Sequence, residues 1–597
     1  MIDAGRWCTL PVMNRIASAA ITGLVVLLLA GCGGGGGDTA VAPNPPPAPA
    51  ATSDQPLADV TAYSSQANGS LPGAEEAAAI THHSITLGSQ AIIYTAKAGH
   101  LIARDPATGE AEASFFYVAY TADGALAASR PVTFFYNGGP GSATVWLHLG
   151  SYGPRRLATA VPGTSASRPF PLVNNAESLL DTTDLVFVNA VGTGLSTAIA
   201  PFTNQSFWGV DRDAAVMRDF IVRYLAVNER AASPKFLFGE SYGGPRTAVL
   251  ARLLQDAGVR LDGLVLQSPA MDYNSNCGVT GSPTISCAGY LPSYGAVGLH
   301  HGLVAPLPTS LQGFIDELRG FAQQSYAPAV AALVGGASGG GSGSAAATAL
   351  VPRLVGYTGL AAAQWQAQFN LPPETCMRSL LPGSLLGRYD GRISALLGSP
   401  LAAEGDPSST LISASFASAI NDELRTTLRY TSGSTYVLLS NAIQTWDFSH
   451  AGRALPDTVP DLALALQQNP ALRVLAISGL HDLATPFHQT ELDLARLGAG
   501  ERVRIRNYAG GHMSYLDDGS RPQQKADLVA FYRGTLAVRS ASLVLEQPHA
   551  RAAVLEADRA GTPVAAPAVD EPAVQAPLRD PWVPPRLLAR PAPLADI

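Results

Sequence analysis

Residues 235–244 read KFLFGESYGG, an apolar strand pattern that runs directly into the pattern Gly-x-Ser-x-Gly. Helical periodicity follows at once, carried by Val249, Leu250, Leu253 and Leu254. A serine between a strand and a helix, with small residues two places to either side, is typical of a nucleophile elbow, a tight turn that holds the serine above a sheet. A plain surface turn is the alternative, and the flanking strand and helix weaken it. We therefore predict that Ser241 is a nucleophile.

Strand and helix patterns alternate along much of the chain. Apolar strand patterns occur at 132–136, 184–191, 235–238, 261–267, 472–478 and 503–508, and helical patterns at 216–225 and 523–536. Short, fully apolar strands between helices favour a mostly parallel sheet covered on both faces. Two further runs, 90–96 and 114–121, predict antiparallel strands at a sheet edge. With the elbow, this order predicts an α/β-hydrolase fold.

Composition predicts how the chain is divided. We expect a signal peptide at 1–31, a flexible glycine- and proline-rich linker at 32–75, and the first part of the hydrolase core at 76–273. The alternation is lost over 274–430, which we interpret as an inserted cap whose glycine-serine run at 335–344 is a mobile loop. The second part of the core is expected at 431–538. An alanine- and proline-rich tail, predicted to be disordered, occupies 539–597.

The N-terminus carries an export signal. Arg6 and Arg15 precede an apolar run over 16–30 that is long enough for a signal peptide but short for a membrane span. The run ends at Leu-Ala-Gly-Cys32, which resembles a bacterial lipoprotein box. In that class Cys32 is lipidated, and Gly33 after it favours the outer membrane. An ordinary cleaved signal is the alternative. Either way we expect an exported protein; as a lipoprotein it would contact the membrane through its lipid anchor only.

Charge and cysteine content exclude some classes of protein. The net charge is −8, only 14% of residues are charged, and there is no run of lysine or arginine, so we expect no nucleic-acid partner. No pattern of metal ligands or phosphate loop occurs, so we expect no metal and no cofactor. Without Cys8 and Cys32, three cysteines remain. An oxidising compartment permits one disulfide, and Cys277 with Cys287 would close a short loop.

A nucleophilic serine needs a base and an acid, which in this fold follow it in the order serine, acid, histidine. His512 follows two glycines after the last strand pattern, and Asp482 follows the strand pattern at 472–478. We predict the triad Ser241, Asp482 and His512. Asp482 as a helix or loop cap is the alternative. His481 and His488 beside it are predicted to be surface or hydrogen-bonding residues.

An oxyanion hole needs two backbone donors that point at one position. We predict the N–H of Tyr242 and the N–H of Gly139, which lies in the glycine-rich turn after the strand pattern at 132–136. Glycine at that turn lets the backbone approach a substrate carbonyl closely.

Four motifs resemble the serine carboxypeptidase family (peptidase S10). They are 237–244 around the serine, 137–142 (NGGPGS), 191–196 (VGTGLS) and 510–513 around the histidine, in the family's order. The resemblance implies release of a C-terminal residue from a peptide substrate through an acyl-enzyme. It also implies that Asn137 and Glu240 hold the terminal carboxylate of the peptide. Two carboxyl groups repel unless one is protonated, so burial of Glu240 would favour acidic pH.

The chain departs from the family pattern at four places. Phe135 stands where the family has tryptophan, Ser151 where a second glutamate belongs, and Asn189 where an aspartate belongs, and no proline follows Met513. These changes leave the triad intact but weaken the carboxylate-binding network. An esterase or acyltransferase on the same triad therefore stays an alternative. A non-catalytic, lipid-tethered binding protein is another, which the complete triad opposes.

Overall fold

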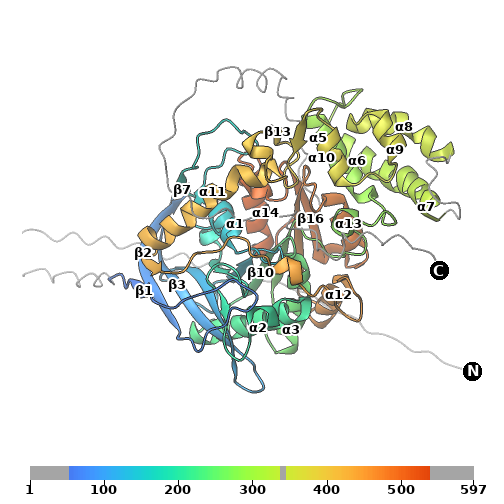
Figure 1. The fold of residues 1–597 in the computed structure, drawn as a ribbon. Coiled ribbons are helices and arrows are strands. Elements are labelled where there is room, and N and C mark those ends of the chain that lie inside the picture. The colour runs from blue at the N-terminus through green and yellow to red at the C-terminus, as the bar shows by residue number, and fades with distance from the viewer. Residues whose placement is uncertain (1–52, 336–344, 538–597) are drawn as a thin grey trace, which may run out of the picture. The chain divides into compact units, whose positions relative to one another are not determined.

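The computed structural model describes residues 53–335 and 345–537 (Figure 1). The predicted signal peptide, Cys32, the tail at 539–597 and nearly all of the glycine-serine run lie outside the described residues.

The central sheet of the described chain has ten strands in the order β16-β15-β11-β10-β5-β8-β4-β3-β2, with β9 paired to β4. Its strands are β2 (Ala77–Leu87), β3 (Gln90–Arg104), β4 (Ala111–Ala122), β5 (Val132–Tyr136), β8 (Asp184–Val188), β9 (Thr197–Ala198), β10 (Lys235–Glu240), β11 (Gly263–Gln267), β15 (Arg473–Gly479) and β16 (Val503–Tyr508). In this spatial order, the neighbouring strands from β16 across to β8 pair in parallel. β4 pairs antiparallel with β8, and β2, β3 and β4 pair antiparallel at the edge of the sheet.

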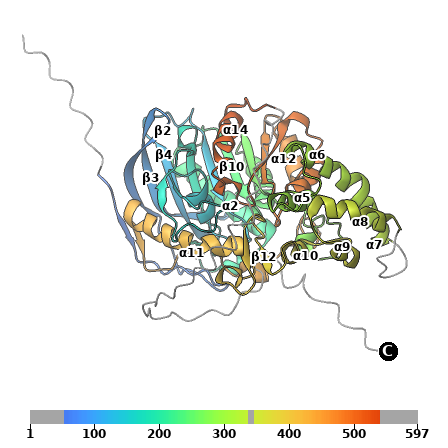
Figure 2. The same ribbon diagram turned by 90° about the horizontal axis from the view of Figure 1, so that it is seen from above.

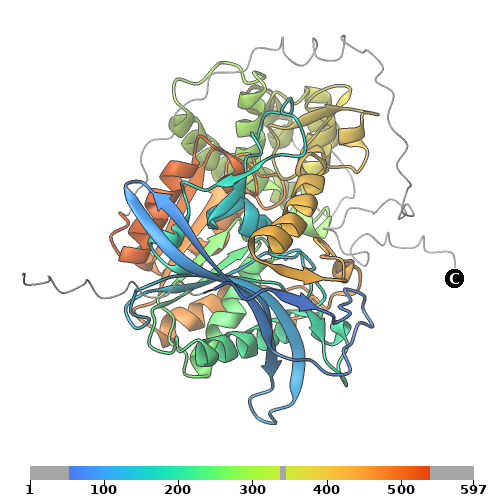
Figure 3. The same ribbon diagram turned by 90° about the vertical axis from the view of Figure 1, so that its left-hand side faces the viewer.

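Helices cover both faces of this sheet, as Figure 3 shows. Alternate strand residues point to opposite faces, so Phe134 and Leu237 pack with α2 (Val210–Val227), α3 (Gly243–Asp256) and α12 (Val459–Gln468). Phe135 and Phe238 pack on the other face, with α11 (Pro407–Asp422) and α14 (Arg521–Arg533). A mostly parallel sheet between two helical layers confirms the predicted α/β-hydrolase fold.

Several element boundaries differ from the prediction. The strand expected at 184–191 ends at Val188, because the chain then turns through Asn189, whose side chain accepts a hydrogen bond from Thr144 N–H. β10 reaches Glu240, two residues further than expected, so the nucleophile directly follows the strand. The last helix ends at Arg533 and not at 536, since Gly534 adopts a left-handed conformation (φ 73°).

The predicted flexible linker is wrong for residues 53–75. Strand β1 (Leu57–Asp59) pairs in parallel with β14 (Tyr430–Ser432), and Leu71 is buried. Asp59 accepts hydrogen bonds from the hydroxyls of Tyr63 (2.8 Å) and Tyr430 (2.7 Å). Few apolar residues make these contacts, and the pairing with β14 joins segments distant in sequence, so no local periodicity signals it. Residues 32–52 lie outside the described part.

The insertion forms a helical cap with its own core, but it ends earlier than predicted. Its helices are α4 (Cys277–Thr280), α5 (Leu291–His300), α6 (Leu311–Phe321), α7 (Ala327–Gly335), α8 (Ala345–Thr358), α9 (Ala362–Ala367) and α10 (Pro373–Ser379). They pack around a separate cluster that includes Leu291, Tyr326 and Trp365. Figure 2 shows this group beside the sheet and α11 lying along the sheet. Because Phe416 and Ile420 of α11 pack in the sheet's core, residues 407–430 belong to the hydrolase core.

Short elements complete the described chain. They are α1 (Val145–Leu147), α13 (Phe487–Ala495), the pair β6 (Arg155–Leu157) and β7 (Leu172–Asn174), and the pair β12 (Ser384–Leu386) and β13 (Ser394–Leu396). Cys277 and Cys287 form a disulfide with Cα atoms 5.3 Å apart, and Cys376 is a buried thiol. No helix within the described ranges is both long and apolar enough to cross a membrane.

Candidate active site

Ser241 occupies a strained turn between β10 and α3. Its φ is +62°, a conformation that non-glycine residues rarely adopt. The Ser241 N–H donates to the carbonyl of Gln267 (2.9 Å), which ties the turn to the neighbouring strand. A Cβ on Gly239 would collide with the carbonyl oxygen of Gly243, so the glycines of the motif permit the close approach of strand and helix. This is the geometry of a nucleophile elbow.

Asp482 and His512 lie within hydrogen-bond distance, at the ends of neighbouring strands. His512 Nδ1 is 2.8 Å from Asp482 Oδ2. Asp482 is fully buried, and its Oδ1 accepts from the N–H groups of Ala484 (2.7 Å) and Thr485 (3.0 Å). The Thr485 hydroxyl is 2.9 Å from both Asp482 Oδ2 and His512 Nδ1. The loop after β15 therefore holds the carboxylate, and the carboxylate orients the imidazole.

The second ring nitrogen, His512 Nε2, is buried and has no hydrogen-bond partner among the described residues. His512 and Ser241 line the same cavity, which has a volume of about 900 Å³. Burial lowers the pKa of His512, but the charge and hydrogen bond of Asp482 and the charge of Glu240 outweigh burial and raise it. An imidazole held at Nδ1 with Nε2 free can take a proton from a serine hydroxyl.

Backbone bonds also hold the histidine loop in place. The His512 N–H donates to the carbonyl of Tyr389 (2.5 Å), and the hydroxyl of Ser268, after β11, donates to the His512 carbonyl (2.7 Å). The other two histidines near the acid are buried: His481 Nδ1 lies 3.3 Å from the Gly510 carbonyl, and His488 Nδ1 lies 2.8 Å from Glu491. They are hydrogen-bonding residues and not surface residues.

The glycine-rich turn after β5 lies directly against the elbow, since β5 and β10 are neighbouring strands. A Cβ on Gly138 would lie only 2.4 Å from the backbone nitrogen of Tyr242 and 2.8 Å from that of Gly243, which is a steric clash, so only glycine fits there. Gly139 has φ +105°, which also favours glycine. The two donors predicted for the oxyanion hole, Gly139 and Tyr242, therefore come from segments in mutual contact.

Glu240 and Asn137 form a buried pair beside Ser241. Asn137 Nδ2 donates to Glu240 Oε1 at 2.8 Å, and both residues line the cavity. The other carboxyl oxygen, Oε2, is buried and has no hydrogen-bond partner in the described chain. Burial raises the pKa of Glu240 to about 7, while the charge of His512 opposes the rise. Below neutral pH, a carboxyl group in this state is protonated and can donate a hydrogen bond to a bound carboxylate.

Phe135 and Ser151, two of the residues that depart from the family pattern, make packing or backbone contacts in this chain. Phe135 stacks between Phe187 and Phe238, with both ring centroids at 4.8 Å. The hydroxyl of Ser151 donates to the Leu147 carbonyl (2.5 Å) and so is turned to the backbone. Because residue 151 is a serine, it supplies no second carboxyl group to the Asn137–Glu240 pair.

Sequence reasoning missed three residues beside the site: Thr485, Arg246 and Tyr515. The buried phenol of Tyr515 lies beside Glu240, and burial together with the charge of Glu240 raises the pKa of Tyr515. Thr485, three residues after Asp482, had a detectable local pattern, because a side-chain carboxylate often accepts from the N–H three residues on. Arg246 was detectable as a charge among apolar helix residues. Nothing in the sequence pattern distinguished Tyr515.

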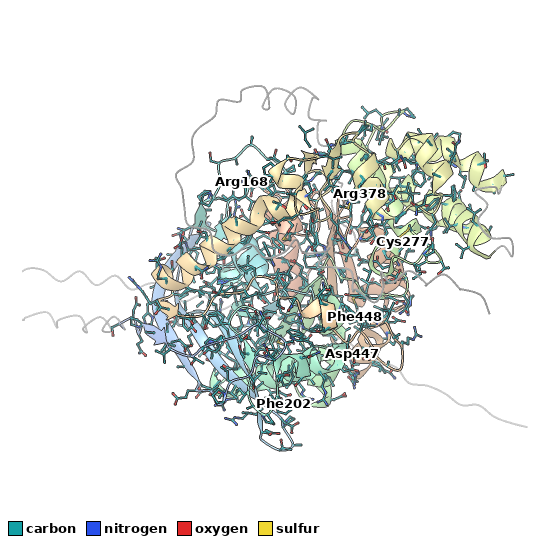
Figure 4. The ribbon with its side chains drawn as sticks, viewed as in Figure 1. Arg168, Phe202, Cys277, Arg378, Asp447 and Phe448 are labelled. Carbon is teal, nitrogen blue, oxygen red and sulfur yellow. A yellow bond between two sulfur atoms is a disulfide. The ribbon has the colours of Figure 1, made fainter. Side chains whose placement is uncertain are left out.

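The cap and α11 form the far wall of the cavity. α10 contributes Glu374, Met377 and Arg378, and Figure 4 labels Arg378 at this position. α11 contributes Ile412 and Ser413. Among the described residues, no group of three or more histidine, cysteine, aspartate or glutamate side chains has the geometry to hold a metal ion.

Residues 90–288 match the serine carboxypeptidase family. That stretch contains the glycine-rich turn, the elbow and the Asn137–Glu240 pair, and spans a third of the chain. No curated protein sequence matches this chain.

Solved structures with similar folds have low sequence identity. The prohormone-processing carboxypeptidase Kex1(delta)p of Saccharomyces cerevisiae is 16% identical, covers 75% of this chain and 92% of its own, and has a TM-score of 0.46. Proline iminopeptidase of Mycobacterium smegmatis is 15% identical, with 76% and 98% covered and a TM-score of 0.30. A putative aryl esterase of Burkholderia cenocepacia is 15% identical, with 73% and 99% covered and a TM-score of 0.32. The fold assignment rests on the strand order of this chain.

Proposed function

We propose that this protein is a serine carboxypeptidase. Ser241 attacks the last peptide carbonyl, and His512 takes the serine proton and passes it to the leaving amine. The N–H groups of Tyr242 and Gly139 bind the oxyanion. Water, activated by His512, then releases the acyl group from Ser241. Asp482 orients the imidazole throughout.

The observation that carries the exopeptidase proposal is the Asn137–Glu240 pair. Its unpartnered Oε2 is buried beside the nucleophile, where the terminal carboxylate of a peptide would lie. When Glu240 is protonated, it donates a hydrogen bond to that carboxylate, and Asn137 holds the other Glu240 oxygen in place. Ionised Glu240 repels the same carboxylate. Peptides with a free C-terminus are therefore favoured at pH values below about 7.

The test compares a blocked dipeptide with its C-terminal amide between about pH 4 and 8. The wild type should cleave the free acid faster, most clearly at low pH, and Ser241→Ala should cleave neither. Loss of the nucleophile should lower kcat by about 10⁶-fold, as in other serine hydrolases. Equal cleavage of acid and amide would refute the exopeptidase proposal while keeping the hydrolase.

A second candidate is an esterase or acyltransferase that uses the same three residues. It is favoured by Ser151, whose hydroxyl bonds to the backbone and supplies no second carboxyl group beside Glu240. The same assay separates the two, since an esterase would cleave simple esters and ignore the free carboxylate. A non-catalytic binding protein would bind a peptide equally well as wild type and as S241A, without turnover.

We also propose that the protein is an exported lipoprotein anchored through Cys32 in the outer membrane. The proposal is supported by the apolar run and the Leu-Ala-Gly-Cys sequence before the linker, and the Cys277–Cys287 disulfide suits an oxidising compartment. Labelling with a fatty acid should occur in the wild type and be absent in Cys32→Ala. Labelling that survives the substitution would refute the proposal.

A further inference from the structure

Arg246, in the first turn of α3, is a fully buried cation beneath the candidate oxyanion hole. It forms a two-point ion pair with Asp213 of α2, with Nε 2.6 Å from Oδ2 and Nη2 3.2 Å from Oδ1. Its third donor, Nη1, donates to the backbone carbonyl of Asn137 at 2.5 Å. The guanidinium therefore links the helix after the nucleophile to the start of the glycine-rich turn.

The same guanidinium also lies against two aromatic rings. Its central carbon is 5.2 Å from the ring centroid of Tyr242 and 5.6 Å from that of Tyr136, both within the range of cation–π attraction. Tyr242 carries one predicted oxyanion donor, and Tyr136 is the last residue of β5. One buried side chain thus contacts both segments from which the predicted donors come.

Stability alone does not account for this arrangement. Removing two charges from water costs about as much free energy as a buried ion pair returns, so well-packed apolar residues would serve α2 and α3 as well. Apolar residues would, however, leave the Asn137 carbonyl without this donor. A hydrogen bond to that carbonyl fixes the orientation of the peptide between Asn137 and Gly138, which lies one residue before the predicted Gly139 donor. Oxyanion donors act only when they are held to within a few tenths of an ångström.

We propose that Arg246 is a positioning residue for the oxyanion hole. By holding the Asn137 carbonyl and the Tyr242 ring together, it sets the separation between the glycine-turn donor and the Tyr242 N–H. Asp213 fixes the plane of the guanidinium and has no contact with the reacting atoms. The inference rests on the proposed acyl transfer at Ser241.

Arg246→Met tests the proposal, because methionine keeps much of the side chain's length but neither donates nor carries charge. Arg230→Met is the matched control. Arg230 is a buried arginine that pairs with Asp184 at the start of β8, and its Nη2 donates to the Arg130 carbonyl at 2.9 Å. Like Arg246 it joins an ion pair to a backbone carbonyl, but it does so at the amino ends of the strands.

Each variant is titrated with a fluorophosphonate so that kcat is expressed per reactive serine. We expect R246M to lose about 10- to 100-fold in kcat, less than the 10²- to 10³-fold loss of a whole donor. KM should stay within about twofold. Affinity for a peptide trifluoromethyl ketone, which forms a tetrahedral oxyanion on the serine, should fall by the same factor as kcat. Affinity for the product peptide should not change.

R230M should lower the melting temperature by about as much as R246M does, but its kcat should stay within about twofold of the wild type. The inference is wrong if R246M keeps both kcat and ketone affinity within twofold of the wild type. It is also wrong if R230M loses as much kcat as R246M does. Should R246M fail to fold, Arg246→Lys decides: lysine reaches Asp213 or the Asn137 carbonyl but not both, so kcat should fall about 10-fold, and an unchanged kcat overturns the inference. A wild type that does not react with the fluorophosphonate refutes the proposed function itself.

Discussion

Asp482 and Glu240 are buried carboxyl groups near the same nucleophile, but their surroundings differ. Asp482 accepts hydrogen bonds from two backbone N–H groups and contacts the Thr485 hydroxyl and the His512 ring. Glu240 accepts a hydrogen bond from the Asn137 amide and lies beside the Tyr515 phenol, and its Oε2 has no partner within hydrogen-bond geometry in the described chain. The loop after β15 thus surrounds the Asp482 carboxylate with donors. Glu240, at the end of β10, has an oxygen that can still gain a ligand or a proton. The difference supports the roles that we propose, which are orientation of His512 for Asp482 and substrate recognition for Glu240.

Replacing Asp482 by Asn gives the largest expected effect. The amide keeps the volume but donates where the carboxylate accepts, so His512 takes the wrong tautomer and kcat falls by about 10⁴-fold. Steady-state kinetics on an ester measure the change. Asp518→Asn, at a half-exposed carboxylate paired with Arg156, serves as the control and should stay within about twofold. A loss below about 10-fold in D482N would show that Asp482 does not orient the histidine.

Replacing Glu240 by Gln should change the pH dependence of stability. The pKa of Glu240 is about 7 in the folded protein, above its ordinary value of 4.5. A raised folded pKa favours folding at pH values below 4.5, and this contribution is lost as pH rises through 7. The wild type should therefore lose about 3 kcal/mol relative to E240Q between pH 4 and 8. Denaturant unfolding at both pH values measures it, and a difference that is independent of pH contradicts the assigned environment.

The same variant should also change the pH dependence of activity. For the wild type, kcat/KM on a free-acid dipeptide should fall about five- to sixfold between pH 7 and 8, as Glu240 ionises with a pKa of about 7. In E240Q the amide donates at every pH, so the profile should stay level across this range. The C-terminal amide substrate is the internal control, since it carries no carboxylate and should show no such fall in either enzyme. Parallel profiles for both substrates would assign Glu240 a structural role.

Thr485→Val gives the smallest expected effect. Valine removes the hydroxyl that contacts both Asp482 and His512 but keeps the two backbone N–H bonds to the carboxylate. The imidazole should orient less well, and kcat should fall by about fivefold, or about 1 kcal/mol. Thr485→Ser keeps the hydroxyl and should restore most of the activity. Equal losses in both variants would indicate that the methyl group, and not the hydroxyl, matters.

The core was predictable because its signals are local. Ser241 lies within a strand, a turn and a helix that are contiguous in sequence, and Asp482 and His512 each follow an apolar strand pattern. Residues 53–75 and 407–430 were assigned wrongly for the opposite reason. β1 pairs with β14 across some 370 residues, and α11 has a helical pattern that does not reveal which core it packs against. β1 and β14 have three residues each, which is too short to show periodicity.

The amino-acid sequence by itself determined the α/β-hydrolase fold, the order of the three candidate catalytic residues and the glycines that the elbow requires, because each depends on steric limits or periodicity within a few residues. Only the tertiary structure decided what surrounds them. The contact of Arg246 with Asn137, the two unequal environments of Asp482 and Glu240, and the place of Tyr515 beside Glu240 all join segments more than 100 residues apart or depend on burial. Burial and hydrogen bonding set the charge state of a carboxyl group, and neither is encoded at a single position of the chain.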